Sequence, residues 1–150
     1  MISMPADALL DTNVLLYAIS KVPAEAAKAQ AANHLIATVD FGLSVQVCQE
    51  FYVAATLKIA QRITSAEAVR FLRLFAQRPL VKLTSELMFR AVDLHQQHRI
   101  SYWDAAVIAA AEELGSSTVY TEDLNHGQKF GSITVVNPFL GIASPRQSTP

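Results

Sequence analysis

Short apolar runs alternate along this chain with longer segments in which apolar residues recur every three or four positions. The short runs predict buried strands at residues 9–11, 43–47, 80–83, 118–121 and 133–136. The longer segments predict helices at residues 14–19, 23–38, 50–61, 67–77, 86–98 and 102–114. Strands that alternate with helices are typical of a parallel sheet between helical layers. We therefore predict an α/β fold with a parallel β-sheet sandwiched between α-helices.

Several predicted helix ends carry capping signals. Thr64 followed by Glu67 three residues later has the pattern of a capping box at the start of the helix at 67–77. Pro79 follows the end of that helix and cannot continue it. Ser101 is placed to cap the helix at 102–114, and Gly115 is placed to end it.

Composition places the chain among single-domain globular proteins. Its 150 residues are 51% hydrophobic, enough for one core, so we predict a domain at residues 1–140 and a flexible tail, rich in Pro and Ser, at residues 141–150. No apolar run approaches the roughly 18–20 residues that span a bilayer. The start of the chain lacks the pattern of a signal peptide, and the single cysteine, Cys48, is typical of a reducing compartment. We expect a cytoplasmic protein with no membrane partner.

Four acidic residues fall where the predicted strands end or the predicted helices begin. Asp11 ends the first strand, Glu50 follows the second, and Asp123 follows the strand at 118–121. Asp104 lies in the first turn of the helix at 102–114. The carboxyl ends of parallel strands share one edge of a sheet, where sites form. Each acid alone fits a helix N-terminus, but four at one edge favour a shared site.

Four carboxylates held close together repel one another, and a divalent cation removes that conflict. Oxygen ligands suit Mg²⁺ or Mn²⁺. Such an ion lowers the pKa of a bound water and stabilises charge on a phosphoryl oxygen. The acid pattern therefore favours metal-dependent hydrolysis of phosphodiesters, without a nucleophilic Ser, Cys or His.

Four sequence blocks resemble the motifs of a known family, in the same order along the chain. These blocks are "LLDTNVLLYA", "SVQVCQEFY", "SYWDAAVIAAAEELG" and "YTEDLNHGQKF…VVNPF". They resemble the motif blocks of PIN-domain ribonucleases, and above all the VapC-type toxins of bacterial toxin–antitoxin pairs. The resemblance extends over residues 8–139. It implies a PIN-like parallel sheet with helices on both faces and an acidic metal site.

The resemblance also assigns roles to the acids. Asp11 and Asp104 match the main metal ligands, and Glu50 and Asp123 match residues that complete the site directly or through water. The implied activity is an endoribonuclease that uses Mg²⁺ or Mn²⁺. A metal-activated water would attack the phosphodiester and leave a 5′-phosphate and a 3′-hydroxyl, with a carboxylate helping to accept the proton.

Polar residues beside the acids match further motif positions. Thr12 and Asn13 match the small polar positions after the first acid, and Thr121 matches the hydroxyl position before the last. Their implied role is to orient the carboxylates. Glu122 adjoins Asp123 and is an alternative to it. Because successive side chains on an extended segment point in opposite directions, we predict that only Asp123 belongs to the site.

The charges are unevenly distributed. Residues 57–99 hold eight of the twelve Lys and Arg residues but three of the thirteen Asp and Glu residues. Lys58 and Arg62 are four residues apart, and Arg70 and Arg73 are three apart, as on one face of a helix. These four cations are candidates for contacts with RNA phosphates.

The resemblance further implies two protein partners. VapC-type toxins form homodimers and are held inactive by an antitoxin, whose C-terminal segment lies over the active-site groove. The predicted helices at 50–61 and 67–77 are candidate contact surfaces through their aromatic residues Phe51, Tyr52, Phe71 and Phe75. The alternative is ordinary core packing, which we expect for at least half of these aromatics.

Two other functions remain open from the sequence. A PIN-like fold without catalytic activity would be a protein-binding module, and the presence of all four acids counts against it. A phosphatase of the haloacid dehalogenase kind also places an Asp after its first strand. That chemistry needs a second Asp two residues later, where this chain has Asn13.

Overall fold

The computed structural model describes residues 5–142, and within them six strands form one sheet. The strand order is β3-β2-β1-β4-β6-β5. Neighbouring strands are parallel except β5, which is antiparallel to β6. This architecture confirms the predicted α/β fold. The strands are β1 (Ala8–Leu10), β2 (Phe41–Ser44), β3 (Leu80–Val81), β4 (Thr118–Tyr120), β5 (Lys129–Phe130) and β6 (Ile133–Val136).

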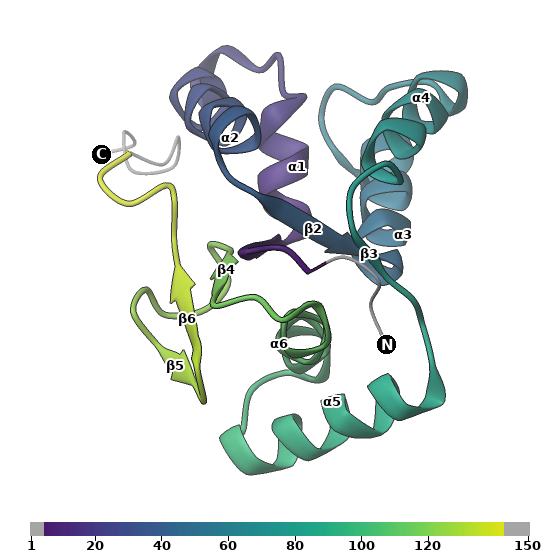
Figure 1. Cartoon of the computed structure of the whole chain (residues 1–150). Helices are drawn as coiled ribbons and strands as arrows, with labels where there is room; N and C mark the ends of the chain where they lie inside the picture. The colour runs from purple at the N-terminus through teal and green to yellow at the C-terminus, as the bar shows by residue number, and fades with distance from the viewer. Residues whose placement is uncertain (1–4, 143–150) are drawn as a thin grey trace.

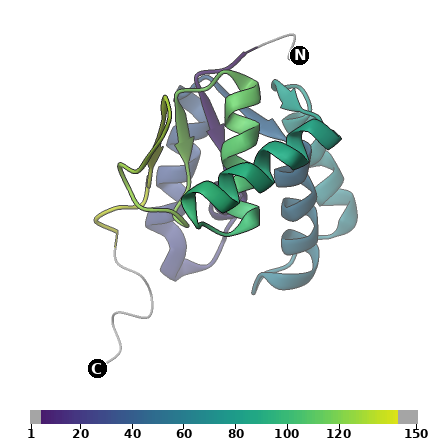
Figure 2. The same ribbon diagram turned by 90° about the horizontal axis from the view of Figure 1, so that it is seen from below.

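Helices cover both faces of the sheet, as Figures 1 and 2 show from two directions. α5 and α6 lie on one face, and the first four α-helices lie on the other. The α-helices are α1 (Thr12–Ala18), α2 (Ala26–Thr38), α3 (Val45–Val53), α4 (Ser65–Phe75), α5 (Ser85–His98) and α6 (Tyr102–Leu114). A 3₁₀ turn, η1 (Pro23–Glu25), precedes α2, and a π-helical turn, η2 (Ala54–Lys58), follows α3.

The core consists of two apolar clusters, one on each face of the sheet. Successive residues of β1 belong to different clusters, because strand side chains alternate between faces: Leu9 packs on the α6 side and Leu10 on the α1 side. α6 lies very close to β2 at Gly42. A Cβ atom there would lie 2.7 Å from the Leu114 side chain and 2.8 Å from the Pro79 carbonyl, so only glycine fits this position.

One predicted boundary is wrong and bears on the site. Residues 43–47 were predicted as a strand, but β2 ends at Ser44 and α3 begins at Val45. The Ser44 side chain accepts a hydrogen bond from the Val47 amide at 3.0 Å and so caps the helix. Val45 and Val47 therefore belong to the first turn of α3. Glu50 consequently lies within α3 and not at the start of a helix.

Two smaller differences concern the helix predicted at 50–61 and the strand β5. The helix predicted at 50–61 starts earlier and gives way to η2, which ends at Lys58. The strand β5 was not predicted, because two residues give too short a pattern. The predicted tail at 141–150 lies outside the described residues from residue 143 onwards.

No helix within residues 5–142 is long and apolar enough to cross a membrane.

Candidate active site

Asp11 lies at the junction of β1 and α1 and is 6% exposed. Its backbone amide donates to the Tyr120 carbonyl at 3.0 Å, which joins it to the end of β4. Its side chain caps α1: Oδ1 accepts from the Thr12 amide at 2.7 Å. Oδ2 accepts from the Thr121 hydroxyl at 2.8 Å. The end of one strand and the first turn of one helix therefore fix this carboxylate.

The surroundings of Asp11 make its ionised form costly. Burial raises the pKa of Asp11 to about 6 from the ordinary 3.8. The hydrogen bonds from Thr121 and from the Thr12 amide act in the opposite direction. The negative charges of Asp123 and Glu50 add to the rise. These charge effects indicate that the acids predicted on separate segments lie near one another.

Asn13 connects Asp11 to the segment that follows β4. Its Nδ2 donates to the Thr121 hydroxyl at 3.1 Å and to Asp123 Oδ2 at 3.2 Å, with Asp11 Oδ2 at 3.5 Å. The Thr121 hydroxyl also accepts from the Asp123 amide at 3.1 Å. The small polar positions noted in the sequence therefore lie between two carboxylates and orient both of them.

Asp123 is more exposed than Asp11 but shares its electrostatic environment. Partial burial raises the pKa of Asp123 above its ordinary value, and the nearby charge of Asp104 adds to this rise. The hydrogen bond from Asn13 acts in the opposite direction. The influence of Asp104 on Asp123 places the start of α6 beside the segment that follows β4.

Glu50 and Asp104 approach the site from helices. The Thr12 hydroxyl lies 3.5 Å from Glu50 Oε1 and 3.4 Å from the Val47 carbonyl, so it bridges α1 and α3. Gln46 donates to the same Glu50 oxygen at 3.3 Å. Asp104 lies in the first turn of α6, where its amide donates to the N-cap Ser101 hydroxyl at 3.0 Å.

The structure therefore brings the four predicted acids to one edge of the sheet. Within residues 5–142 it does not gather three or more Asp, Glu, His or Cys side chains as they would surround a metal ion. The donor set is nevertheless of the right kind, because it consists of carboxylate and hydroxyl oxygens. Burial, with the nearby charges of Asp123 and Glu50, disfavours the negative charge of Asp11 and raises its pKa. A divalent cation would offset this cost.

Two residues that the sequence did not single out reach the same edge. Tyr17 and Lys28 both contact Glu122, at 2.9 Å from the Tyr17 hydroxyl and 3.2 Å from the Lys28 Nζ. Glu122 is therefore held by Tyr17 and Lys28, whereas the Asp123 carboxylate accepts from Asn13. Lys28 and Glu122 are 94 positions apart, so no local pattern could have paired them.

The predicted basic residues are exposed, and only one pair keeps the predicted spacing. Arg70 and Arg73 lie on α4 with their side chains in solvent. Lys58 is the last residue of η2, and Arg62 lies beyond it outside any helix. The prediction that Lys58 and Arg62 share one helical face is therefore wrong.

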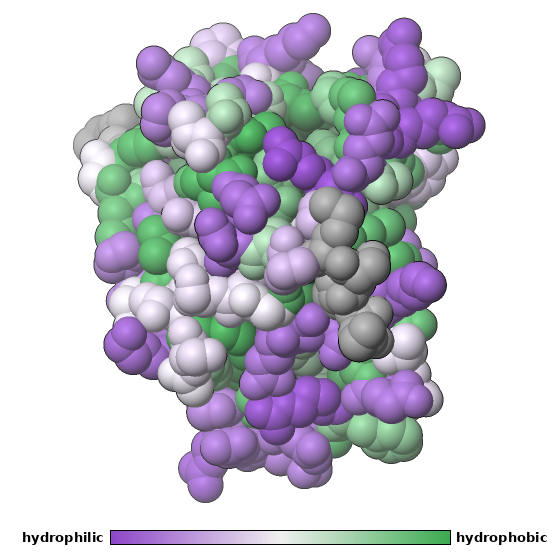
Figure 3. All heavy atoms as spheres, viewed as in Figure 1, coloured by the Kyte–Doolittle hydropathy of each residue, from purple (hydrophilic) through white to green (hydrophobic). Residues whose placement is uncertain are grey.

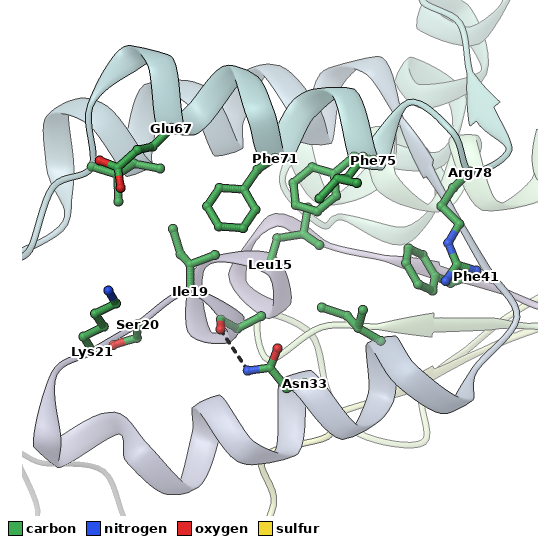
Figure 4. Close-up of a pocket in the computed structure, with 14 residues that line it drawn as sticks. Leu15, Ile19, Ser20, Lys21, Asn33, Phe41, Glu67, Phe71, Phe75 and Arg78 are labelled. Carbon is green, nitrogen blue, oxygen red and sulfur yellow. Dashed lines mark hydrogen bonds between the residues drawn. The ribbon is translucent and has the colours of Figure 1, made fainter.

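An apolar groove of about 480 Å³ lies between α4 and the pair α1 and α2. Figure 4 shows Phe71 and Phe75 of α4 facing Leu15 of α1 and Ile19, the residue that follows α1. In the space-filling view, hydrophobic surface lies between these helices among hydrophilic side chains (Figure 3). Phe51, predicted as a contact residue, is fully buried beneath Phe71 and Phe75, so it belongs to the core.

Charged residues mark both ends of the groove. Lys21 and Glu67 lie at one end and Arg78 at the other (Figure 4). The Arg78 guanidinium stacks over the Phe41 ring at 4.1 Å from its centroid. Asn33 of α2 donates to the Ala18 carbonyl at 2.9 Å and ties α2 to the end of α1. The groove is therefore apolar along its length and polar at its ends.

Three solved structures illustrate the similarity of the fold to known proteins. A toxin–antitoxin complex from Klebsiella pneumoniae is 20% identical, with a TM-score of 0.65 over 87% of this chain and 97% of that chain. FitAB bound to a DNA fragment is 21% identical, with a TM-score of 0.65 over 88% and 95%. VapC20 from Mycobacterium tuberculosis, a toxin that cleaves the sarcin–ricin loop, is 21% identical, with a TM-score of 0.62 over 77% and 89%.

The sequence itself gives the family. A comparison with curated proteins found no match. The model of the PIN domain family matches residues 8–129, which include all four acids and most of the four sequence blocks. The chain belongs to the PIN domain family.

Proposed function

We propose that this protein is a metal-dependent endoribonuclease that acts as the toxin of a toxin–antitoxin pair. The observation that carries the proposal is the arrangement around Asp11. A buried carboxylate with a pKa of about 6 shares one hydrogen-bond donor, Asn13 Nδ2, with a second acid, Asp123. Perturbed acids that converge at the carboxyl edge of a parallel sheet are typical of a functional site.

The four acids would divide the work of such a site. Asp11 and Asp104 would hold Mg²⁺ or Mn²⁺, and Glu50 and Asp123 would complete the site directly or through water. When bound, the ion would lower the pKa of a water molecule and stabilise charge on the scissile phosphate. Thr121 and the Thr12 amide favour the ionised form of Asp11 by donating to it. Glu50 and Asp123 are the exposed members of the four acids. Of these two, Glu50 would accept a proton from the attacking water.

RNA and an antitoxin are the proposed partners. The exposed Arg70 and Arg73 would contact RNA phosphates. The groove between α1, α2 and α4 would receive an apolar segment of the antitoxin, with Phe71 and Phe75 as its main contacts. The similarity to a toxin–antitoxin complex and to a toxin that cleaves the sarcin–ricin loop supports both partners. A homodimer and a cytoplasmic location remain part of the proposal.

The test is cleavage of total cellular RNA by the purified protein in Mg²⁺, Mn²⁺ or EDTA. Discrete fragments that need the metal and disappear in both Asp11→Asn and Asp104→Asn would support the proposal. Arg90→Met is the control, because Arg90 pairs with Glu112 between α5 and α6 and has no part in the acid site. Cleavage that persists in EDTA would contradict metal dependence.

A protein-binding module without catalysis is the second candidate. It is favoured by the fact that no group of three or more metal-ligating side chains is assembled within residues 5–142. Mn²⁺ binding separates the two functions. A silent module would show no Mn²⁺ binding that depends on Asp11 and Asp104, whereas the nuclease would lose binding in either Asn variant.

A further inference from the structure

Three charged or polar side chains form a compact network just outside the acid site. Lys28 of α2 donates to Glu122 Oε2 at 3.2 Å and to the Tyr17 hydroxyl at 3.2 Å. Tyr17 of α1 donates to Glu122 Oε1 at 2.9 Å. Each of the three therefore contacts the other two. The side chains of Lys28 and Glu122 are 13% and 26% exposed, so the pair is largely shielded from solvent.

The last of the four sequence blocks ends with Asn137, Pro138 and Phe139, and this segment supports the network. The Phe139 ring packs edge-on against the Tyr17 ring, with centroids 4.8 Å apart. Lys28 Nζ lies 4.7 Å from the Tyr17 centroid and 5.6 Å from that of Phe139. The Phe139 amide donates to Asn137 Oδ1 at 2.9 Å, which fixes the turn that presents the ring.

The segment that follows β4 is held from both sides. On one side Glu122 is bound by Tyr17 and Lys28. On the other side Asn13 Nδ2 donates to Asp123 Oδ2 at 3.2 Å, and Asn13 Oδ1 accepts from the Glu122 amide at 3.4 Å. Successive side chains of an extended segment point in opposite directions. Anchoring Glu122 outwards therefore directs Asp123 inwards.

We propose that Lys28, Tyr17 and Glu122 form a clamp that sets the direction of the Asp123 carboxylate, so that Lys28 and Tyr17 are positioning residues of the acid site. The part that concerns RNA cleavage rests on the proposed function. The part that concerns the segment 121–123 does not, because it is a statement about backbone order and side-chain direction.

The charge of Lys28 has a second effect on the site. Glu122 contributes to the raised pKa of Asp123 through its negative charge, and Lys28 compensates that charge at contact distance. Although burial acts to lower it, hydrogen bonds from Lys28 to Tyr17 and Glu122 raise the pKa of Lys28 above its ordinary value. Lys28 therefore retains its positive charge at neutral pH.

Three conservative variants take the clamp apart. Tyr17→Phe removes one hydroxyl and keeps the ring against Phe139. Lys28→Met removes the charge at nearly constant length, and Glu122→Gln removes the opposite charge. The double variant Lys28→Glu with Glu122→Lys restores a pair of opposite sign. Arg90→Met is the matched control, because it removes an ion pair of 2.7 Å that lies between α5 and α6.

The primary readout is hydrogen–deuterium exchange of the amides of Glu122 and Asp123, which donate to Asn13 and Thr121. We expect faster exchange at these two amides in all three single variants, with unchanged exchange in β1 and β6. The second readout is Mn²⁺ affinity by electron paramagnetic resonance, which we expect to fall about tenfold or more. With RNA, kcat should fall while KM changes little. The charge swap should restore all three.

The outcomes separate the clamp from the nuclease. Faster amide exchange with weaker Mn²⁺ binding, in a protein that cleaves no RNA, would support the clamp and contradict the proposed activity. Unchanged exchange at Glu122 and Asp123 in Lys28→Met and Glu122→Gln would overturn the clamp, whatever the activity. An equal effect of Arg90→Met, or no recovery in the charge swap, would also overturn it, because the ion pair would then act through general stability.

Discussion

The acid site has two halves that are held in different ways. Asn13 Nδ2 donates to both Asp11 and Asp123, and the Thr121 hydroxyl donates to Asp11 and accepts from the Asp123 amide, with contacts of 2.8–3.5 Å. Glu50 and Asp104 are carried by α3 and α6. Glu50 lies 3.5 Å from the hydroxyl of Thr12, whose amide donates to Asp11. The first half is pre-organised by side-chain hydrogen bonds. The second is positioned by the packing of helices.

The two halves also differ in whether they hold a carboxylate in an unfavourable environment. In the half around Asp11, a buried carboxylate is held at a raised pKa, so ligand binding there would relieve an unfavourable interaction. In the half around Asp104, the first turn of α6 sets the position of the carboxylate. Variants of the two halves should therefore differ in their effects on stability and on metal binding.

The largest expected effect comes from removing one ligand charge in each half. Asp11→Asn and Asp104→Asn should each lower kcat/KM for RNA cleavage by roughly a hundredfold or more, because a bound ion supplies several kcal/mol of transition-state stabilisation. Initial rates with defined RNA fragments measure this. If only Asp11→Asn lost activity, the helix-borne half would not belong to the reaction centre.

Stability should distinguish the halves next. In the unfolded chain Asp11 ionises near pH 3.8 and in the folded protein near pH 6, so the unfolded state releases its proton first. The stability of the metal-free protein should therefore fall as pH rises from about 4 to 6, by about 3 kcal/mol from this residue. Below pH 4 both states are protonated and the penalty is absent.

Asp11→Asn removes this penalty. In EDTA, the variant should be more stable than the wild type by up to about 3 kcal/mol at pH 8 and no more stable at pH 4. Urea unfolding at a series of pH values measures the difference. Asp104→Asn is the comparison from the other half and should show a much smaller gain. Parallel curves for wild type and Asp11→Asn would contradict the raised pKa.

Hydroxyl removal gives a finer comparison, since Thr→Val keeps the shape of the side chain. Thr121 is 1% exposed and its hydroxyl contacts Asp11, Asn13 and Asp123. Thr121→Val should lower Mn²⁺ affinity by about tenfold to a hundredfold, as expected for a residue that orients ligands. Thr12→Val loses only contacts of 3.4–3.5 Å and should have a smaller effect. Isothermal titration with Mn²⁺ tests this, and equal effects would remove the distinction between the halves.

The two halves also differ in how far the sequence could predict them. Local sequence signals predicted helix ends correctly. Thr64 and Glu67 form the capping box at the start of α4, and Gly115 ends α6 with φ of 73°. The strand ends that carry Asp11 and Asp123 were predicted from apolar runs of two or three residues. The start of α3 was not, because the alternation of residues 43–47 suits a strand as well as the first turn of a helix capped by Ser44.

Contacts between segments that are distant in the sequence could not be predicted, for a different reason. Lys28 reads as one cation in an alanine-rich helix, and Glu122 as a spare acid beside Asp123. Their ion pair exists only because β4 lies next to β1 and thereby brings the segment after β4 to α1 and α2. Motif order indicates which acids converge, whereas their donors and counter-charges follow from the packing.

The smallest effect concerns the surface that lies outside both halves. Arg70 and Arg73 are exposed on α4, and Arg70→Glu with Arg73→Glu should weaken RNA binding without changing the folded structure. If both contact phosphates, the slope of log affinity against log salt should become shallower by about 1.4, at roughly 0.7 per contact for single-stranded RNA. Binding by the inactive Asp11→Asn protein, measured by fluorescence anisotropy over a range of salt, gives the slope.

The control variant is Lys82→Glu with Lys129→Glu, which makes the same change in net charge at two other exposed positions. An equal change of slope in both double variants would show a general effect of net charge. Arg70 and Arg73 would then not be specific RNA contacts.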